Sequence, residues 1–436
     1  MSDWTHGYVA DVTYTPGFYR ECMPTWLSFA STLLAQRPPD LSRPFRYADF
    51  GCGQGMSLLV AAATAPHGEF WGFDFSPTHI EFARNLAEKA GLTNVRFVEA
   101  GFSDIAGAPE STYPPFDFIV THGVISWVTQ GDAAALFQIF GNRLRPGGLA
   151  YLSYNTPTGW FGMAELRVLM RLLRSKSTKR SDIAIGGILD YLDRLKNEGA
   201  AIFQLIPGLG DRLTEFRKQD LRYVSHELLN ANWRGMMFED VAGPMADMKC
   251  NYIGSATLLE NVDGLCMAPG VAAMVAEADD TDMREVLRDL GTGRSFQRDM
   301  YRRGLAPLSM AEHQDVLETI EVAAVGSALP ADMSFSGPRG KIAPNGTLHK
   351  DIFEAVAAAP ISLAKLHRQV AKQNESVPQV MEAVATLVDN ALVHPVAPGG
   401  LSAEAIAASA GLNRATSAAN ASGAAVTAWA VAAATP

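Results

Sequence analysis

Short apolar runs alternate with amphipathic stretches in the first third of the chain, and the alternation stops after residue 155. A run of roughly four to eight apolar residues is typical of a buried strand, whereas apolar positions three and four apart are typical of a helix. The pattern predicts strands over 46–50, 69–73, 95–99, 116–121 and 149–154, helices over 56–65, 76–90 and 132–144, and a turn at 145–148. Strands that alternate with helices form βαβ units, so we expect an α/β fold with a Rossmann-like sheet.

A long helical pattern follows this region. From 164 to 229 apolar and basic residues occupy different helix faces: Leu166, Leu169, Met170 and Leu173 on one, and Arg167, Arg171 and Arg174 on another. A helix over 238–245 and strands over 249–257 and 297–302 then resume the earlier pattern. The sequence therefore predicts that a helical insertion, 160–235, interrupts a single sheet.

The C-terminal third has a different pattern. Helices over 349–358, 362–371 and 377–389, followed by a strand over 391–395, have the order of a winged helix. The third helix contains Glu382 and Asp389 and neither Lys nor Arg, and an acidic recognition helix would repel phosphate. We therefore expect this region to pack against protein and not to read DNA. The segment from Ser402 onward is rich in alanine and serine and is expected to be poorly ordered.

Composition and charge narrow the class of protein. Of the 436 residues, 48% are hydrophobic, which is enough for more than one core. The formal charge of −10 argues against nucleic acid or an anionic membrane as partner. The longest apolar stretch, 424–434, is shorter than the roughly 20 residues that a bilayer requires, so we expect a cytoplasmic protein. The four cysteines form no C-x-x-C pair and have no histidine at zinc spacing, so neither disulfides nor a metal site are expected.

A glycine-rich motif lies where the first strand passes into a helix. The sequence Asp49-Phe50-Gly51-Cys52-Gly53-Gln54-Gly55 has glycine at three alternate positions, which lets a ligand approach the backbone closely. A dinucleotide fingerprint would need its third glycine at Met56. The acidic Asp49 suits a ligand with an ammonium group, such as the methionine moiety of S-adenosylmethionine. We therefore predict that Asp49, Gly51, Cys52, Gly53 and Gly55 bind S-adenosylmethionine; a plain tight turn is the alternative.

Residues after the second and third strands extend this predicted site. Asp74 ends the second strand, where doubly wound folds place a carboxylate that accepts the ribose hydroxyls. Phe75 is expected to cover the adenine, and Gly101 and Phe102 to form the other side of that pocket. Phe102 as an ordinary core residue is the alternative.

The fourth and fifth strands end in polar and aromatic residues. Ligands meet the carboxyl ends of strands in open α/β sheets, which brings Thr121 and His122 to the cofactor. His122 is either a contact to cofactor or substrate or a structural residue. Trp127 is expected to wall an acceptor pocket, because an aromatic face favours a cation, and Tyr154 and Asn155 offer a phenol and an amide at the same edge. His122, Trp127 and Tyr154 are the catalytic candidates, although methyl transfer needs chiefly alignment.

Taken together, these motifs resemble those of a known family. The chain is similar to class I S-adenosylmethionine-dependent methyltransferases with a methyltransferase regulatory domain, a group that includes bacterial enzymes that methylate protein lysines. The resemblance rests on the glycine loop and Asp74, and on 122–127, 145–148, 153–156, 223–227 and 296–299. Two departures are Ile125, where the family tends to have Tyr, and Thr158 in the segment Pro157-Thr158-Gly159-Trp160.

The resemblance implies a domain plan and a function. With the pattern of elements it predicts a methyltransferase core with the cofactor site at 1–159, the insertion or lid at 160–235 and the rest of the sheet with the regulatory region at 236–305. The pattern and composition alone predict a winged-helix-like domain at 306–400 and a tail at 401–436. The resemblance implies methyl transfer to an unidentified acceptor, either a protein, including a protein lysine, or a small molecule. We expect the insertion to lie over the carboxyl edge of the sheet and help form the acceptor site. A homodimer is compatible with the sequence.

Two other functions fit parts of the sequence. A nucleoside-binding regulatory or protein-recruiting module without catalysis would use the glycine loop and the winged helix alone. A nicotinamide oxidoreductase would need the glycine spacing that Met56 breaks. The basic stretch of Arg171, Arg174, Lys176, Lys179 and Arg180 could steer an acidic substrate, with a solvated helix end as the alternative.

Overall fold

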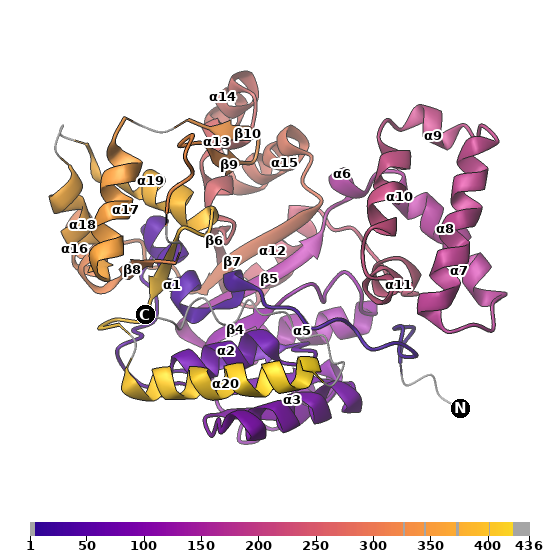
Figure 1. Cartoon of the computed structure of the whole chain (residues 1–436), viewed down its shortest axis with the longest axis horizontal. Coiled ribbons are helices and arrows are strands. Elements are labelled where there is room, and N and C mark those ends of the chain that lie inside the picture. Colours follow the sequence, from indigo (N-terminus) through magenta and orange to yellow (C-terminus); the bar gives the residue numbers. More distant parts are fainter. Residues whose placement is uncertain (1–4, 326–327, 344–345, 372–374, 401, 422–436) are drawn as a thin grey trace.

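The computed structural model describes residues 5–421, except for 326–327, 344–345, 372–374 and 401. At its centre is a seven-stranded sheet with the order β3-β2-β1-β4-β5-β7-β6 (Figure 1). The strands are β1 Arg46–Phe50, β2 Glu69–Asp74, β3 Val95–Glu99, β4 Phe116–Thr121, β5 Leu144–Asn155, β6 Cys250–Ser255 and β7 Phe296–Arg303. Neighbours pair in parallel except that β7 is antiparallel to both β5 and β6. The predicted Rossmann-like α/β fold, interrupted between β5 and β6, is confirmed.

Each face of the sheet is covered by helices because strand residues alternate between two cores. Tyr47 and Phe70 belong to the core that contains α1 Pro24–Leu33, α2 Met56–Thr64 and α3 Pro77–Ala90. Ala48 and Phe73 belong to the other core, which contains α4 Phe102–Gly107, α5 Gln130–Arg143 and α12 Phe238–Asp247. The side chains of Tyr47, Ala48, Phe70 and Phe73 are fully buried. The packing on both faces therefore holds the carboxyl edge of the sheet in a fixed position.

The turn predicted at 145–148 is wrong. These residues form the irregular start of β5, which pairs Leu144 with Phe116 and Leu149 with Phe118. The extra residues bulge out of the ladder, and Gly147 accommodates the bulge with a positive φ of 87°.

The helical insertion forms a body with its own apolar core. Its helices are α6 Pro157–Trp160, α7 Met163–Ser175, α8 Ser181–Asn197, α9 Ile202–Leu205, α10 Leu209–Arg217 and α11 Leu221–Leu229. Leu166 and Met170 pack against Ile185, Ile188 and other apolar residues of this body. Figure 1 shows α7 to α11 to the right of the sheet, reached directly from β5 through α6.

A second group of helices lies between β6 and β7 along the chain. It comprises the short 3-10 helix η2 Leu258–Asn261, and α13 Asp263–Cys266, α14 Pro269–Glu277 and α15 Thr281–Thr292. A further 3-10 helix, η1 Arg20–Cys22, precedes α1.

The C-terminal region lies at the opposite side of the molecule from the insertion (Figure 1). It contains α16 Met310–Thr319, β8 Glu321–Ala324, β9 Phe335–Gly337, β10 Gly340–Ile342, α17 Leu348–Ala358, β11 Ile361–Ser362, α18 Leu363–Val370, α19 Val377–Asp389 and β12 Val393–Val396. A small antiparallel sheet has the order β11-β8-β12. The predicted helices and strand are confirmed, and the winged-helix assignment stays a prediction. No helix among the described residues is both long and apolar enough to span a bilayer.

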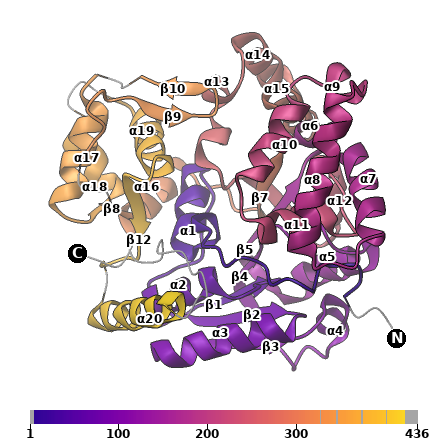
Figure 2. The same ribbon diagram turned by 45° about the vertical axis from the view of Figure 1, so that its right-hand side comes forward.

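The prediction of poor order after Ser402 is wrong for Ala403–Ala421, which form helix α20. This helix lies along α2 and α3 (Figures 1 and 2). Small residues permit the close approach: a Cβ atom at Gly411 would lie 2.4 Å from the carbonyl oxygen of Ala90. Leu412 and Ala415 are buried in the contact. Residues 422–436 of the predicted tail lie outside the described residues.

Candidate active site

A cavity of about 820 Å³ opens at the carboxyl ends of β1, β2 and β4. Loops after the strands form one wall, and the N-terminal segment, residues 5–19, together with α11 forms the other. Of the predicted site residues, those that line it are Gly51, Cys52, Gly53, Gly55, Asp74, Phe75, Gly101, Phe102, His122, Trp127 and Asn155. The structure therefore brings most of the predicted site together in one place.

The glycine loop adopts a conformation that side chains disfavour. Gly51, Gly53 and Gly55 have φ values of 78°, 53° and 75°. A Cβ atom at Gly51 would lie 2.5 Å from a methyl group of Val124, and one at Gly55 would lie 2.5 Å from the ring of Phe97. A Cβ atom at Gly53 would meet nothing within 4 Å. Gly53 is therefore the position where the backbone is open toward the cavity.

The carboxylate of Asp74 is tied to this loop. Its Oδ2 accepts a hydrogen bond of 2.9 Å from the backbone N–H of Gly53, and its Oδ1 accepts one from Ser76 N–H at 2.9 Å. His79 Nδ1 lies 3.2 Å from Oδ1. Asp74 thus lines the cavity at a fixed position where β2 ends.

Asp49 does not reach the cavity surface. Its carboxyl group is buried behind the loop, where burial and the charge of Asp74 raise its pKa to about 7. The direct contact between Asp49 and a ligand ammonium group stays a prediction. The buried position of the Asp49 carboxyl group does not support it.

Phe75 and Phe102 lie where the predicted adenine pocket requires aromatic walls. Phe75 meets the ring of Tyr8 edge-on at 5.5 Å. Phe102 both lines the cavity and packs against the core on one face of the sheet, and its contact with adenine stays a prediction. Gly101 lies directly before α4, at the same rim.

His122 is stacked and neutral. Its ring lies 3.8 Å from the ring of Tyr19, and its Nδ1 lies 2.7 Å from Tyr151 Oη. Burial, with the charge of Arg298, lowers its pKa to about 3. His122 is therefore a weak base and acts as an aromatic wall. The hydroxyl of Thr121, one residue earlier, is buried away from the cavity.

The two residues at the end of β5 point in opposite directions. Tyr154, a predicted catalytic residue, is fully buried, and its Oη donates a hydrogen bond of 2.7 Å to Asp299 Oδ2 in the core on the other face. Asn155 lines the cavity, and among the described residues its Nδ2 has no hydrogen-bond partner. Because strand side chains alternate, only one of the pair could reach the site, and the choice of Tyr154 was wrong.

The predicted acceptor wall at Trp127 already holds a cation from the insertion. The guanidinium carbon of Arg167 lies 5.3 Å from the ring of Trp127 and 5.2 Å from that of Trp233. Its Nη1 and Nη2 donate to the backbone oxygens of Glu227 and Asn230. Trp127 therefore helps to hold the insertion against the cavity wall through its contact with Arg167.

The sequence-based reasoning missed a group of tyrosines in the N-terminal segment. Tyr8, Tyr14 and Tyr19 line the cavity, and Gln54 Nε2 donates to the backbone oxygen of Tyr14 at 3.2 Å. The segment has no strand or helix periodicity, so the pattern gave no signal for it. In Figure 2 it runs along the insertion toward α1.

The insertion holds this segment in place. Val9 N–H donates to Asn230 Oδ1 at 2.7 Å, and His226 Nε2 donates to the backbone oxygen of Val12 at 2.9 Å. Asp11 accepts from the backbone N–H of Ser181 at 2.9 Å. The segment and α11 therefore form one wall of the cavity.

Helix α11 contributes the second group that was missed. Tyr223, His226, Glu227 and Asn230 all face the cavity, at positions three and four apart on one side of the helix. Burial raises the pKa of Glu227 to about 7, opposed by the charge of Arg167 and a hydrogen bond with Tyr223. The motif 223–227 was part of the family resemblance, but its residues had no assigned chemistry.

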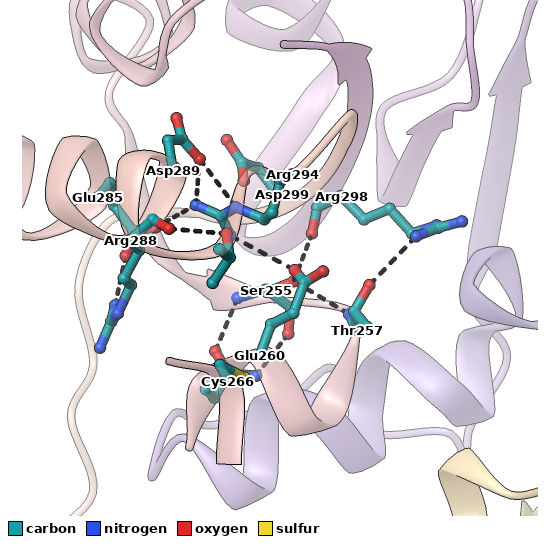
Figure 3. A network of polar contacts seen from close by, with 12 residues as sticks. Ser255, Thr257, Glu260, Cys266, Glu285, Arg288, Asp289, Arg294, Arg298 and Asp299 are labelled. Atoms are coloured by element: carbon teal, nitrogen blue, oxygen red, sulfur yellow. Dashed lines mark hydrogen bonds and ion pairs between the residues drawn. The ribbon is translucent and has the colours of Figure 1, made fainter. Parts of the chain in front are cut away.

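A network of polar contacts includes Arg294, which lies just before β7 (Figure 3). Arg294 lies 2.5 Å from Asp289, 3.2 Å from Glu285 and 3.4 Å from Glu260. The backbone oxygens of Arg294 and Ser295 then accept hydrogen bonds from the first residues of the insertion: Thr156, Thr158 and Trp160. The network thus fixes the junction between β5, β7 and the insertion.

Arg298, further along β7, places a cation in the cavity wall. Its guanidinium lies 5.0 Å from the ring of Phe296, and Nη1 donates to Thr257 Oγ1 at 3.3 Å. Among the described residues its Nε has no hydrogen-bond partner.

A family model described as a methyltransferase domain matches residues 42–199, and one described as a predicted methyltransferase regulatory domain matches 220–303. An uncharacterized protein of Synechocystis sp., sll1526, is 31% identical over 392 residues, which cover 90% of this chain and 77% of that protein. A trans-aconitate 2-methyltransferase of Streptomyces coelicolor is 32% identical over 166 residues, 37% of this chain and 50% of that enzyme.

Among solved structures, PKMT2 from Rickettsia typhi in complex with AdoHcy has the same fold. The two share a TM-score of 0.64 and 23% sequence identity, over 88% of this chain and 77% of that chain. The likeness extends beyond the sheet, because the shared part includes most of this chain.

Proposed function

The chain belongs to the class I S-adenosylmethionine-dependent methyltransferases that carry a methyltransferase regulatory domain, and we propose that its methyl acceptor is an amine, with a protein lysine as the first candidate. The transferred group comes from S-adenosylmethionine. A nucleoside-binding module without catalysis and a nicotinamide oxidoreductase are set aside, because the family is one of methyltransferases.

The glycine loop and β2 provide the cofactor end of the cavity. We infer that Gly53 meets the methionine moiety, that Asp74 accepts the ribose hydroxyls, and that Phe75 and Phe102 enclose the adenine. The open position at Gly53 and the unpartnered Nδ2 of Asn155 fit a ligand with carboxylate and hydroxyl oxygens. AdoHcy is bound by PKMT2, which shares this fold.

The observation that carries the amine proposal is the wall opposite this end. Tyr8, Tyr14, Tyr19 and Tyr223 line the cavity together with Glu227, whose charge acts on all four phenols. Aromatic faces and a carboxylate in a partly desolvated site favour a cation. The long, thin side chain of lysine would bring an ammonium group to this position from outside.

The experiment supplies radiolabelled S-adenosylmethionine with two acceptors in parallel. One is a blocked peptide with a single lysine, and the other is trans-aconitate. We expect label on the lysine nitrogen, stable to mild base. Base-labile methyl esters on trans-aconitate, with an unlabelled peptide, would contradict the amine proposal.

A carboxylate acceptor is the second candidate, because Arg298 offers a cation in the same cavity and a relative is named for trans-aconitate. Replacing Arg298 with Gln separates the two candidates. Loss of transfer to trans-aconitate with a retained affinity for S-adenosylhomocysteine would support the carboxylate acceptor.

We propose that the insertion acts as a lid, which the hydrogen bonds between α11 and the N-terminal segment support. We also propose a cytoplasmic location. The charge of −10 supports the further proposal that nucleic acid is not a partner.

A further inference from the structure

We propose that Glu227 takes up the proton that the acceptor ammonium group must lose before methyl transfer, which makes it a catalytic residue of the amine reaction. This inference rests on the proposed amine acceptor. It follows from the position of one carboxylate among aromatic side chains in the cavity wall that α11 and the N-terminal segment form.

The place of Glu227 is set by two elements. On α11, Glu227 is one helical turn after Tyr223, and the two side chains share a hydrogen bond. From the N-terminal segment, Tyr14 lies 6.1 Å from Tyr223 and 5.0 Å from His226, measured between ring centroids. Tyr8 lies 5.1 Å from His226 and 5.5 Å from Phe75. The rings therefore run from the cofactor end of the cavity to Glu227.

Apart from Tyr223, which shares a hydrogen bond with Glu227, the charged and titratable groups that face Glu227 are either neutral or bonded elsewhere. From α7, Arg167 gives its Nη1 and Nη2 to backbone oxygens and is stacked by two tryptophans. From α11, His226 has a pKa lowered to about 4 by burial, so it is neutral at pH 7. The remaining neighbours are phenols with raised pKa values, from Tyr8, Tyr14 and Tyr19 of the N-terminal segment and Tyr223 of α11.

The step balances in atoms and charge. The ammonium group passes one proton to the carboxylate of Glu227, which leaves a neutral amine and a neutral carboxyl group. The nitrogen lone pair then forms the bond to the methyl carbon, while the electron pair of the breaking carbon–sulfur bond goes to the sulfonium sulfur. The product is a methylated ammonium group, and Glu227 later releases its proton to water.

The direction of the pKa values agrees with this role. A buried carboxyl group with a pKa of about 7 holds a proton more readily than a surface glutamate does. Removal of an ammonium group from water lowers the pKa of that group, because burial disfavours the charged form. Both shifts bring the pKa of the ammonium group and the pKa of Glu227 closer to each other. Since the step needs the ionised carboxylate, the rate should rise with pH through a midpoint near 7.

The test compares three variants of the full-length enzyme on the blocked lysine peptide. Glu227→Gln should lower kcat by about 100-fold or more and abolish the pH dependence near 7, because it removes the proton acceptor. Tyr223→Phe removes a hydrogen bond that lowers the pKa of Glu227, so its midpoint should move to higher pH. Glu198→Gln, at an exposed position after α8, is the matched control and should behave as the wild type.

Affinity for S-adenosylhomocysteine, measured by calorimetry, separates the two levels of the argument. A wild-type enzyme that binds this nucleoside and methylates no amine would contradict the amine acceptor itself. Wild-type amine methylation with an unchanged kcat and pH profile in Glu227→Gln would overturn the role of Glu227 alone. If Glu227→Gln fails to fold, an unchanged midpoint in Tyr223→Phe overturns it instead.

Discussion

The backbone N–H of Gly53 donates a hydrogen bond of 2.9 Å to Asp74 Oδ2, so the glycine loop and the end of β2 meet at a single carboxylate. The other oxygen of Asp74 is held by Ser76 and His79. This carboxylate is therefore fixed before a ligand arrives, and ordering it on binding costs little.

Replacing Asp74 with alanine should weaken cofactor binding. The loss should be about 1.5 to 3 kcal/mol, because hydrogen bonds to a charged group contribute about that much. Calorimetric titration with S-adenosylhomocysteine measures it. Glu81→Ala, on the exposed side of α3, is the control. An unchanged dissociation constant in Asp74→Ala would show that the ribose is held elsewhere.

Two glycines of the same loop should respond differently to alanine. Gly55→Ala should lower the free energy of unfolding by at least about 1 kcal/mol, because its positive φ is strained and its Cβ would meet Phe97. Gly53→Ala has the strain without the clash, so it should unfold more easily than the wild type but less easily than Gly55→Ala. Its methyl group would instead obstruct the cofactor. Urea unfolding and nucleoside titration of both variants measure this, and equal losses of stability would contradict it.

The sheet could be predicted from the sequence because each strand is a compact apolar run between turn residues. β1, β3 and β4 begin and end where the pattern placed them. The part of the cavity that we propose to hold the cofactor followed from the same pattern, since the glycine loop and Asp74 are attached to strand ends. These are local features, and each is determined by a few consecutive residues.

The wall of the cavity that we propose as the acceptor end could not be predicted, because it is built from distant segments. Tyr8 and Tyr14 precede any periodic pattern, and hydrogen bonds to α11, more than 200 residues away, hold their segment in place. The prediction that Tyr154 faces the cavity was wrong for another reason. The pattern located the end of β5 but did not show which of its last two residues, Tyr154 or Asn155, faces the cavity. Helix α20 was missed because alanine-rich composition reveals little about the surface against which it packs.

Binding of S-adenosylhomocysteine should protect the insertion as well as the glycine loop from hydrogen exchange. The N-terminal segment touches both, through Tyr14 to Gln54 and through Val9 to Asn230. Exchange measured by mass spectrometry should slow in residues 5–19 and in α11, while α17 on the far side serves as the internal control. Protection confined to the glycine loop would remove the support for a lid.

The C-terminal region should not bind duplex DNA. Nonspecific affinity for DNA comes mainly from Lys and Arg that neutralise phosphates, and a helix-turn-helix reads bases with its second helix. Here that helix would be α19, which is buried along most of its length and whose last backbone oxygens accept hydrogen bonds from Arg20. On the preceding helix, Arg368 is paired with Glu318, and Lys365 is exposed.

Fluorescence anisotropy with duplex DNA at about 50 and 200 mM salt tests whether the C-terminal region binds DNA, because binding through phosphate contacts weakens steeply as salt rises. Micromolar binding with a steep salt dependence, lost in the double variant Lys365→Ala and Arg368→Ala, would refute the prediction; the absence of binding at both salt concentrations would leave packing against the methyltransferase core as the role of α19.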